Sequence, residues 1–155
     1  MFNYKDIDLS DDKNLIIFSK IAEDAAKHIY YENDKPTKSN KSTQIRKFYD
    51  ELCMWENKVN SVNLNSINKE EKDQKRKDSF QQYAPFIYMM KAKVAYSQAR
   101  KSGGATLVNE NFSQVFNQCI EQIKDHKTLR RAKLFMEAVM GFYKLEESKK
   151  GKQND

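Results

Sequence analysis

The sequence predicts an all-α fold, a single-domain bundle of about five helices. Only four glycines and two prolines interrupt 155 residues, whereas strong helix formers such as Lys, Glu, Gln, Leu and Ala are plentiful. Apolar residues recur at three- and four-residue steps along much of the chain. A chain of this length buries roughly two-thirds of its unfolded surface, so residues 1–155 are expected to form one domain.

Two amphipathic helices are expected in the first 60 residues. The first is acidic and spans residues 11–31, and an Asn-, Pro- and Ser-rich loop over residues 32–41 ends it. Its predicted inner face consists of Leu15, Phe18, Ala22, Ala25 and Ile29. Ser42 or Thr43 then caps the second helix, whose predicted inner face consists of Ile45, Phe48, Tyr49, Leu52, Trp55 and Val59.

The middle of the chain is polar. Residues 60–84 show no apolar repeat, so they are predicted to be a surface insertion, either a solvated helical turn or a disordered segment. Pro85 is expected in the first turn of a third helix, which Gly103 and Gly104 end. This helix is predicted to lie at the centre of the bundle, because most of its circumference is apolar: Ile87, Met90, Ala92, Val94, Ala95 and Ala99.

Two more helices complete the predicted bundle. The fourth, over residues 109–126, has the inner face Phe112, Val115, Phe116, Cys119, Ile120 and Ile123. The fifth, over residues 128–147, has the inner face Leu129, Ala132, Phe135, Met136, Val139 and Tyr143. Residues 148–155 are expected to fray. Cys53 and Cys119 each lie in an apolar helical pattern, which predicts reduced core thiols.

The net charge of +6 is unevenly distributed. Residues 1–34 contain four basic and eight acidic residues, whereas residues 35–155 contain 24 basic and 14 acidic residues. This basic body favours a polyanionic partner, although charge also serves solubility. The acidic N-terminus lacks the pattern of a secretory signal, and no stretch approaches the length that spans a bilayer. We therefore expect a cytoplasmic protein without a membrane partner.

The sequence gives no positive reason to predict an enzyme, a cofactor or a metal site. His28 and His126 lie at the ends of different predicted helices, and neither has a catalytic partner at useful spacing. His126 is expected near the C-terminus of the fourth helix, where a cation is favoured. The segment KSGGAT, residues 101–106, has neither the spacing nor the preceding strand of a phosphate loop.

A basic file on the third helix is the first candidate for an RNA contact. Lys93, Ser97 and Arg100 fall in one line, with Tyr96 and Lys101 beside it. Ammonium, guanidinium, hydroxyl and aromatic groups together suit RNA phosphates and sugars. The alternative is a core helix from which the Lys and Arg side chains extend to solvent.

Two further basic clusters are candidates for binding an anion. Lys127, Arg130 and Arg131 place positive charge near a helix N-terminus, where a phosphate group would be favoured. Asp125 nearby is an alternative source of the negative charge. Arg46 and Lys47 project from the outer face of the second helix, and the alternative for Arg46 is an ordinary ion pair with Asp50.

Three segments resemble the small subunit of the type III-A CRISPR effector, the Csm complex. They are KSTQIRKFYDEL (residues 41–52), PFIYMMKAKVAYSQAR (residues 85–100) and LFMEAVMGFYK (residues 134–144), in this order. Members of that family show a Ser/Thr-Gln-Ile-Arg helix start, a Lys-Leu-Ala-Tyr-x-x-x-Arg helix and a closing Glu-Ala-x-x-Ala-Tyr. This chain departs from the pattern at Val94, Gly141 and Phe142, and residues 60–84 are longer than expected.

The resemblance implies a non-catalytic RNA-binding structural subunit. Such a protein is a helical bundle present in several copies, which stack beside the backbone subunits along the guide RNA and the target RNA, together with the large subunit. The matched motifs carry RNA contacts over to Arg46, Lys47, Lys93, Tyr96 and Arg100, without sequence preference. Lys127, Arg130 and Arg131 match no motif. A helical protein-protein scaffold without nucleic-acid contact remains the alternative, and a small nuclease that uses His126 is a more distant one.

Overall fold

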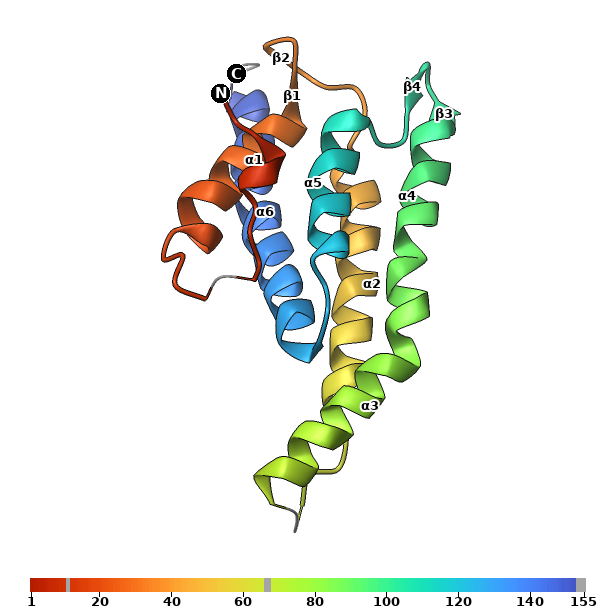
Figure 1. Ribbon diagram of the computed structural model, residues 1–155. Helices are drawn as coiled ribbons and strands as arrows, with labels where there is room; N and C mark the ends of the chain where they lie inside the picture. The colour runs from red at the N-terminus through yellow and green to blue at the C-terminus, as the bar shows by residue number, and fades with distance from the viewer. Residues whose placement is uncertain (11, 66–67, 153–155) are drawn as a thin grey trace.

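Helices dominate the computed structural model, which describes residues 1–10, 12–65 and 68–152 (Figure 1). They are α1 (Ala22–Tyr30), α2 (Ser42–Asn60), α3 (Lys69–Tyr88), α4 (Met90–Ala99), α5 (Glu110–Glu121) and α6 (His126–Lys152). Only Met89 separates α3 from α4, so these two segments form one bent helix and the described residues contain five helical rods. The predicted all-α, single-domain bundle is confirmed.

Short elements complete the fold. One turn of 3-10 helix, η1, spans Tyr4–Asp6, and a π-helical turn, η2 (Ile17–Ile21), leads directly into α1. Two antiparallel hairpins, β1 (Tyr31–Glu32) with β2 (Lys35–Pro36) and β3 (Lys101–Ser102) with β4 (Ala105–Thr106), lie at the same end of the bundle (Figure 1). Gly103 and Gly104 have φ angles of 63° and 83°, which the two-residue turn after α4 requires.

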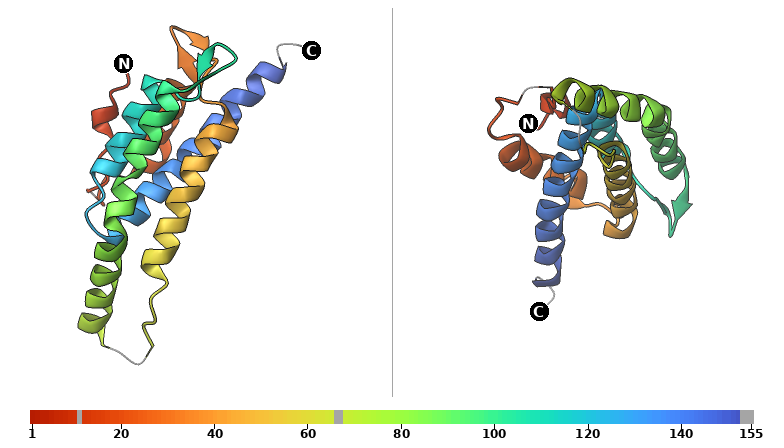
Figure 2. Two further views of the ribbon diagram at one scale, coloured as in Figure 1. Left: turned by 90° about the vertical axis from the view of Figure 1, so that its right-hand side faces the viewer. Right: turned by 90° about the horizontal axis from the view of Figure 1, so that it is seen from below.

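The core lies where α6 crosses α1 and α2 and where α5 packs against α1 and α4 (Figure 2). The rings of Phe48, Phe112 and Phe116 lie 5.5 Å apart, and each ring contributes roughly 1.5–3 kcal/mol by its burial. The predicted inner faces of α5 and α6 are buried throughout. On α2, Tyr49 and Trp55 are half-buried, whereas the other predicted inner residues are buried. Cys119 is buried and Cys53 half-buried, and both are free thiols.

The first predicted helix is wrong in its first half. Its inner residues Leu15 and Phe18 are 92% and 39% exposed, and α1 starts only at Ala22; Asp11 lies outside the described residues. The preceding extended segment fills this side of the core instead, with Ile7 and Leu9 buried. Gln122 holds that segment, because its Nε2 donates to Ile7 O at 2.5 Å and its Oε1 accepts from Leu9 N at 2.6 Å.

The surface insertion predicted for residues 60–84 is largely a regular helix. Asn68 caps α3 by accepting a hydrogen bond from Glu71 N at 2.9 Å, so the helix begins at Lys69 and not near Pro85. Pro85 lies inside α3, where its missing N–H weakens the helix shortly before it bends into α4. Most of α3 is solvated, but Ser79 and Phe80 are buried. Residues 66–67 lie outside the described residues.

Two other expectations are corrected. The third helix is not central: α4 lies at the edge of the bundle, and Ala92, Ala95 and Ala99 are exposed (Figure 1). Only Ile87, Met90 and Val94 of its predicted apolar arc reach the core. The C-terminal segment also does not fray at residue 148, because α6 continues to Lys152. Residues 153–155 lie outside the described residues.

A polar network around Asn40 joins the helices below the hairpins. The fully buried Asn40 side chain donates to Ile29 O at 2.9 Å and to Asn109 Oδ1 at 2.7 Å, and its Oδ1 accepts from Asn109 N at 2.9 Å. Tyr143 Oη donates a short hydrogen bond to Asn40 O. Burial raises the pKa of Tyr143 above its ordinary value. One residue thus connects the end of α1 with the start of α5 and the middle of α6.

Candidate nucleic-acid interface

The predicted RNA-binding residues gather mainly at two places. Four line a groove between α2 and α4: Lys47, Lys93, Tyr96 and Arg100. Three line a pocket at the N-terminal end of α6: Lys127, Arg130 and Arg131. Arg46 and Lys101 are exposed and line neither cavity. Because α4 ends and α6 begins at opposite ends of the bundle, the two places are separate (Figure 1).

The groove, which we call the α2–α4 groove, has a volume of about 440 Å³. From α2, Gln44, Lys47, Phe48 and Glu51 share one face because they recur at helical spacing. The opposite wall is formed by Met89, Ala92, Lys93, Tyr96, Ser97 and Arg100, and Leu107 also lines the groove. The groove is therefore lined by both apolar and cationic side chains.

Lys93 is already paired inside the α2–α4 groove. Its Nζ donates to Glu51 Oε1 at 2.5 Å, and the indole Nε1 of Trp55 donates to Glu51 Oε2 at 3.2 Å. The file predicted on the third helix also breaks at Ser97, which is buried. Among the described residues, Lys47 and Arg100 have no ion pair, so they are the cations of the groove that stay free for a ligand.

Arg46 forms a surface ion pair with Asp50, which was the alternative to an RNA contact for this residue. Its Nε lies 3.8 Å from Asp50 Oδ2, one helical turn away, and both side chains are largely exposed. Such a pair contributes only about 0.2–1 kcal/mol. Arg46 can therefore exchange Asp50 for another anion at little cost.

An aromatic cluster that was not predicted from the sequence extends along the same side of α2. The rings of Trp55 and Phe86 stack with centroids 5.8 Å apart and an interplanar angle of 12°, and Tyr83 packs against Trp55. Lys58 Nζ lies 5.3 Å from the centre of the Trp55 ring. The three-residue spacing of Tyr83 and Phe86 was a possible signal, but Tyr83 was assigned to the predicted insertion and Phe86 to the third helix, and the sequence placed neither beside Trp55.

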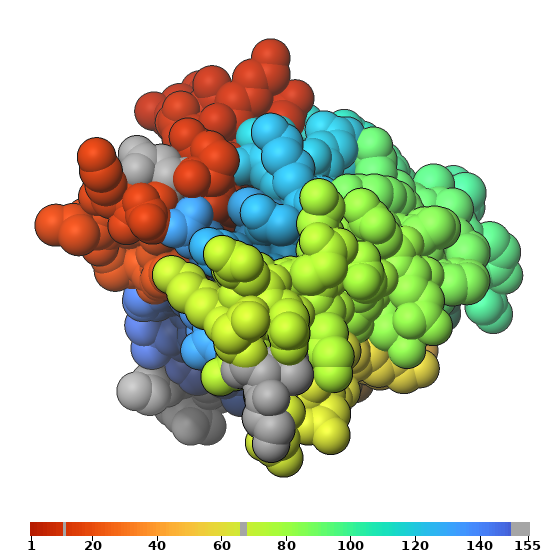
Figure 3. All heavy atoms as spheres, turned by 60° about the horizontal axis from the view of Figure 1, so that its bottom comes forward, coloured from red at the N-terminus to blue at the C-terminus, as the bar shows by residue number. Residues whose placement is uncertain are grey.

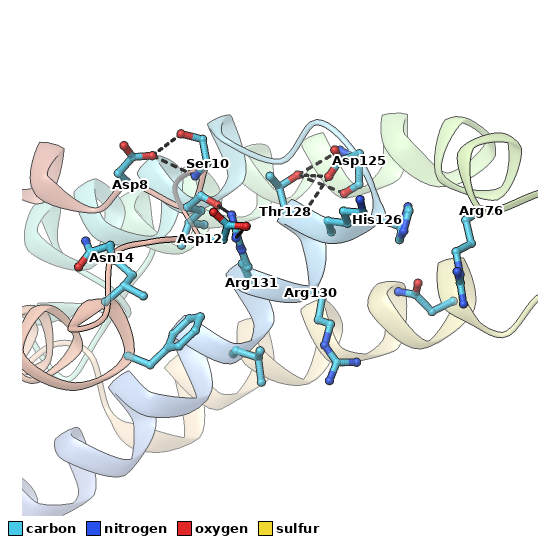
Figure 4. Close-up of a pocket in the computed structure, with 16 residues that line it drawn as sticks. Asp8, Ser10, Asp12, Asn14, Arg76, Asp125, His126, Thr128, Arg130 and Arg131 are labelled. Atoms are coloured by element: carbon cyan, nitrogen blue, oxygen red, sulfur yellow. Dashed lines mark hydrogen bonds and ion pairs between the residues drawn. The ribbon is translucent and has the colours of Figure 1, made fainter. Parts of the chain in front are cut away.

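The second cavity, which we call the α6 pocket, has a volume of about 740 Å³. Seen from the end of the bundle where α6 begins, the N-terminal segment and α3 lie on either side of α6 (Figure 3). Asp12 lies against Arg131, whereas Arg130 extends away from this cluster (Figure 4). Arg131 donates from Nη1 to Leu9 O at 2.7 Å, and its Nη2 lies 3.7 Å from Asp12 Oδ2. Arg131 is therefore occupied by the chain itself.

Asp125 caps α6. It supplies the negative charge that was the alternative to a bound phosphate at this helix N-terminus. Its Oδ1 accepts hydrogen bonds from Thr128 N at 2.8 Å and from Thr128 Oγ1 at 2.9 Å. Burial disfavours the charged carboxylate, but these hydrogen bonds outweigh it and hold the pKa of Asp125 below its ordinary value. The exposed Lys127 and Arg130 have no ion pair among the described residues.

His126 is the first residue of α6 and not the end of the preceding helix, which finishes at Glu121. Burial and the nearby Arg76 lower its pKa, so the predicted favourable dipole contact is wrong. His28 Nε2 lies 3.2 Å from Gln114 Oε1. In the ranges 1–10, 12–65 and 68–152, no group of three or more His, Cys, Asp or Glu side chains has the arrangement of a metal site. None of the described helices is long and apolar enough to cross a membrane.

A helical bundle with cationic side chains around surface cavities is typical of a small binding or assembly protein. The model of the Csm2 Type III-A family matches residues 13–149, so the chain belongs to this family, the small subunit of the type III-A Csm complex. This match covers most of the chain and confirms the resemblance of its three segments. No curated protein and no solved structure matches the chain.

Proposed function

We propose that this Csm2-family protein is a non-catalytic structural subunit that binds the sugar-phosphate backbone of guide RNA and target RNA without sequence preference. Its partners are the backbone and large subunits of the Csm complex and further copies of itself, in the cytoplasm. Family membership supports a place in the type III-A effector. The contact residues proposed are the seven that line the two cavities and two exposed cations outside them: Lys47, Lys93, Tyr96, Arg100, Lys127, Arg130 and Arg131, with Arg46 and Lys101.

One observation carries the proposal: candidates from separate parts of the chain line one groove. Lys47 on α2 and Tyr96 and Arg100 on α4 are brought together only by the packing of these helices. Arginine and lysine side chains bind phosphate oxygens through charge-assisted hydrogen bonds, which recognise the backbone and not the base sequence. The α6 pocket offers a second contact through Lys127 and Arg130, whereas Arg131 must first release Leu9 and Asp12.

The salt dependence of RNA binding tests the proposal. Two unrelated single-stranded RNAs should bind the full-length protein with similar affinity, and the affinity should fall steeply with salt. Arg100→Ala should reduce the slope of log affinity against log salt by about 0.7, because one phosphate contact is lost. Lys35→Ala, an exposed charge on the β1–β2 hairpin, is the matched control and should keep the slope. Sequence-selective binding, or binding that ignores salt, would contradict the proposal.

The alternative is a protein-protein scaffold that never touches nucleic acid. Its support is the exposed apolar surface of the bent helix, where Phe86 and Met89 are each 47% exposed. Nuclease treatment of the protein purified with its natural partners distinguishes the two functions. A pure scaffold should keep all its partners and its ultraviolet absorbance ratio, whereas an RNA-binding subunit should lose bound RNA.

A further inference from the structure

The apolar part of the α2–α4 groove has no role in binding an RNA backbone. Phosphate recognition needs Lys47 and Arg100, but Phe48, Met89, Ala92 and Leu107 also line the groove. Tyr96, on the wall, is 64% exposed. A large exposed aromatic ring in a groove with apolar lining residues indicates a binding surface, because solvation of such a surface is unfavourable.

Exposed apolar side chains continue from the groove along the bent helix. Met89 borders the groove, and Phe86, one turn earlier, stacks on Trp55. Phe86 and Tyr96 are ten residues apart, which corresponds to roughly 15 Å along a helix and leaves room for a few nucleotides. The Trp55 ring is held in place, because its Nε1 donates to Glu51 and Lys58 Nζ lies over its face. This strip is therefore an ordered platform of aromatic and methionine side chains.

The charges around the platform identify its occupant. Lys47 and Arg100 are free cations at one end, and Lys58 lies over Trp55 at the other. Glu51, which alone among the described lining residues carries a carboxylate, is neutralised by Lys93. The site thus offers flat apolar surfaces between positive charges, which complements a chain of flat bases joined by phosphates. An acidic protein segment would match the charges but not the flat aromatic surfaces.

We propose that the platform from Tyr96 to Phe86 binds unpaired bases of single-stranded RNA by stacking, while Lys47 and Arg100 bind the adjacent phosphates. This inference rests on the proposed RNA-binding function and adds the bases to it. Bases in a duplex are stacked on each other and cannot reach the groove, so single-stranded RNA is the preferred ligand. Every base has a flat face, so stacking adds affinity without sequence selection.

Binding of three RNAs of equal length to the full-length protein tests the inference: a mixed-sequence single strand, the same strand without bases, and a duplex. The single strand should bind tightest. Tyr96→Ala should weaken its binding by about 5- to 100-fold, because one stacked base is lost, and should leave the baseless strand unaffected. Tyr96→Phe should retain binding, and Leu145→Ala, which removes an exposed apolar side chain of α6 that lines neither cavity, is the control.

Fluorescence of Trp55, the only tryptophan, gives a second signal. It should change when the single strand binds and stay constant with the baseless strand. Equal affinity for both strands, with no effect of Tyr96→Ala, would overturn the inference and leave backbone binding intact. Failure of all three RNAs to bind would refute the proposed function as well. Since Tyr96 is mostly exposed, its variants should keep the thermal unfolding midpoint of the wild type.

Discussion

Lys93 on α4 donates a hydrogen bond to Glu51 on α2, with Nζ and Oε1 2.5 Å apart. The pair joins two helices across the α2–α4 groove and neutralises one cation of the basic file that the sequence presents. Glu51 also accepts from Trp55, so the carboxylate links the charged part of the groove to the aromatic cluster. The positive charge available to a ligand therefore depends on Glu51.

Glu51→Gln should strengthen RNA binding and make it more salt-dependent. The variant releases the ammonium group of Lys93, so the slope of log affinity against log salt should become steeper by about 0.7. The amide oxygen of Gln still accepts from Trp55. Because Lys93 is half exposed in this pair, the free energy of unfolding should fall by less than about 1 kcal/mol. RNA titrations at several salt concentrations and urea denaturation measure the two effects, and weaker RNA binding would contradict this expectation.

Asn40→Ala should destabilise the fold strongly. The substitution leaves Asn109 N and Ile29 O without their buried partner and places alanine at a φ angle of 56°. A loss of about 2–4 kcal/mol in the free energy of unfolding is expected. Asn33→Ala is the matched control, because Asn33 has a φ angle of 53° but is exposed, so only about 1 kcal/mol should be lost. Urea denaturation compares them, and equal losses would show that the network adds no stability.

Arg131→Ala should loosen the N-terminal segment. Arg131 Nη1 donates to Leu9 O, while the amide of Leu9 donates to Gln122 Oε1. Without the guanidinium group, hydrogen exchange of the Leu9 amide should accelerate, since local opening becomes easier. Arg130→Ala removes the same charge from the exposed neighbour and should leave this exchange rate unchanged. Identical exchange in both variants would mean that Ile7 and Leu9 hold the segment by burial alone.

Acid should weaken the protein partly through Asp125. The pKa of Asp125 is lowered in the folded state, so its stabilising contribution is complete above its unfolded value of 3.8. As the pH falls through the folded pKa, that contribution is lost. Asp125→Asn keeps a capping side chain but cannot titrate, so its free energy of unfolding should change less between pH 5 and 2 than that of the wild type. Parallel pH profiles would contradict this assignment.

The helical periodicity of the chain predicts those helices whose inner face meets the core along their whole length. On α5, Phe112, Phe116 and Ile120 recur at four-residue steps and are all fully buried. The same pattern fails at Leu15 and Phe18, because Ile7 and Leu9 occupy that side of the core. Periodicity within one segment contains no information on which distant segment covers it.

For residues 60–84 the error is the opposite one, because a regular helix is present where the sequence pattern predicted a surface insertion. A helix without a continuous apolar face looks unstable from its pattern alone, yet Asn68 caps α3, and Phe80 and Ile87 anchor it in the core. The sequence could not predict the α2–α4 groove either, because the residues that meet in it, such as Lys93 and Glu51, are 42 residues apart in sequence. Of its lining residues, Lys47, Lys93, Tyr96 and Arg100 were proposed from the motifs and the basic file, whereas their meeting with Phe48 and Leu107 in one groove follows only from helix packing.

By itself, the sequence determined the helical class, the inner faces of α5 and α6 and the Csm2 family of this protein. These properties depend on residue types and on their spacing within one helix, and both are contained in a short stretch of sequence. Only the tertiary structure decided that Glu51 neutralises Lys93, that Arg131 holds the N-terminal segment and that Tyr96 stands exposed in the α2–α4 groove. Each of these depends on which distant residues the packing of the helices brings within a few ångströms.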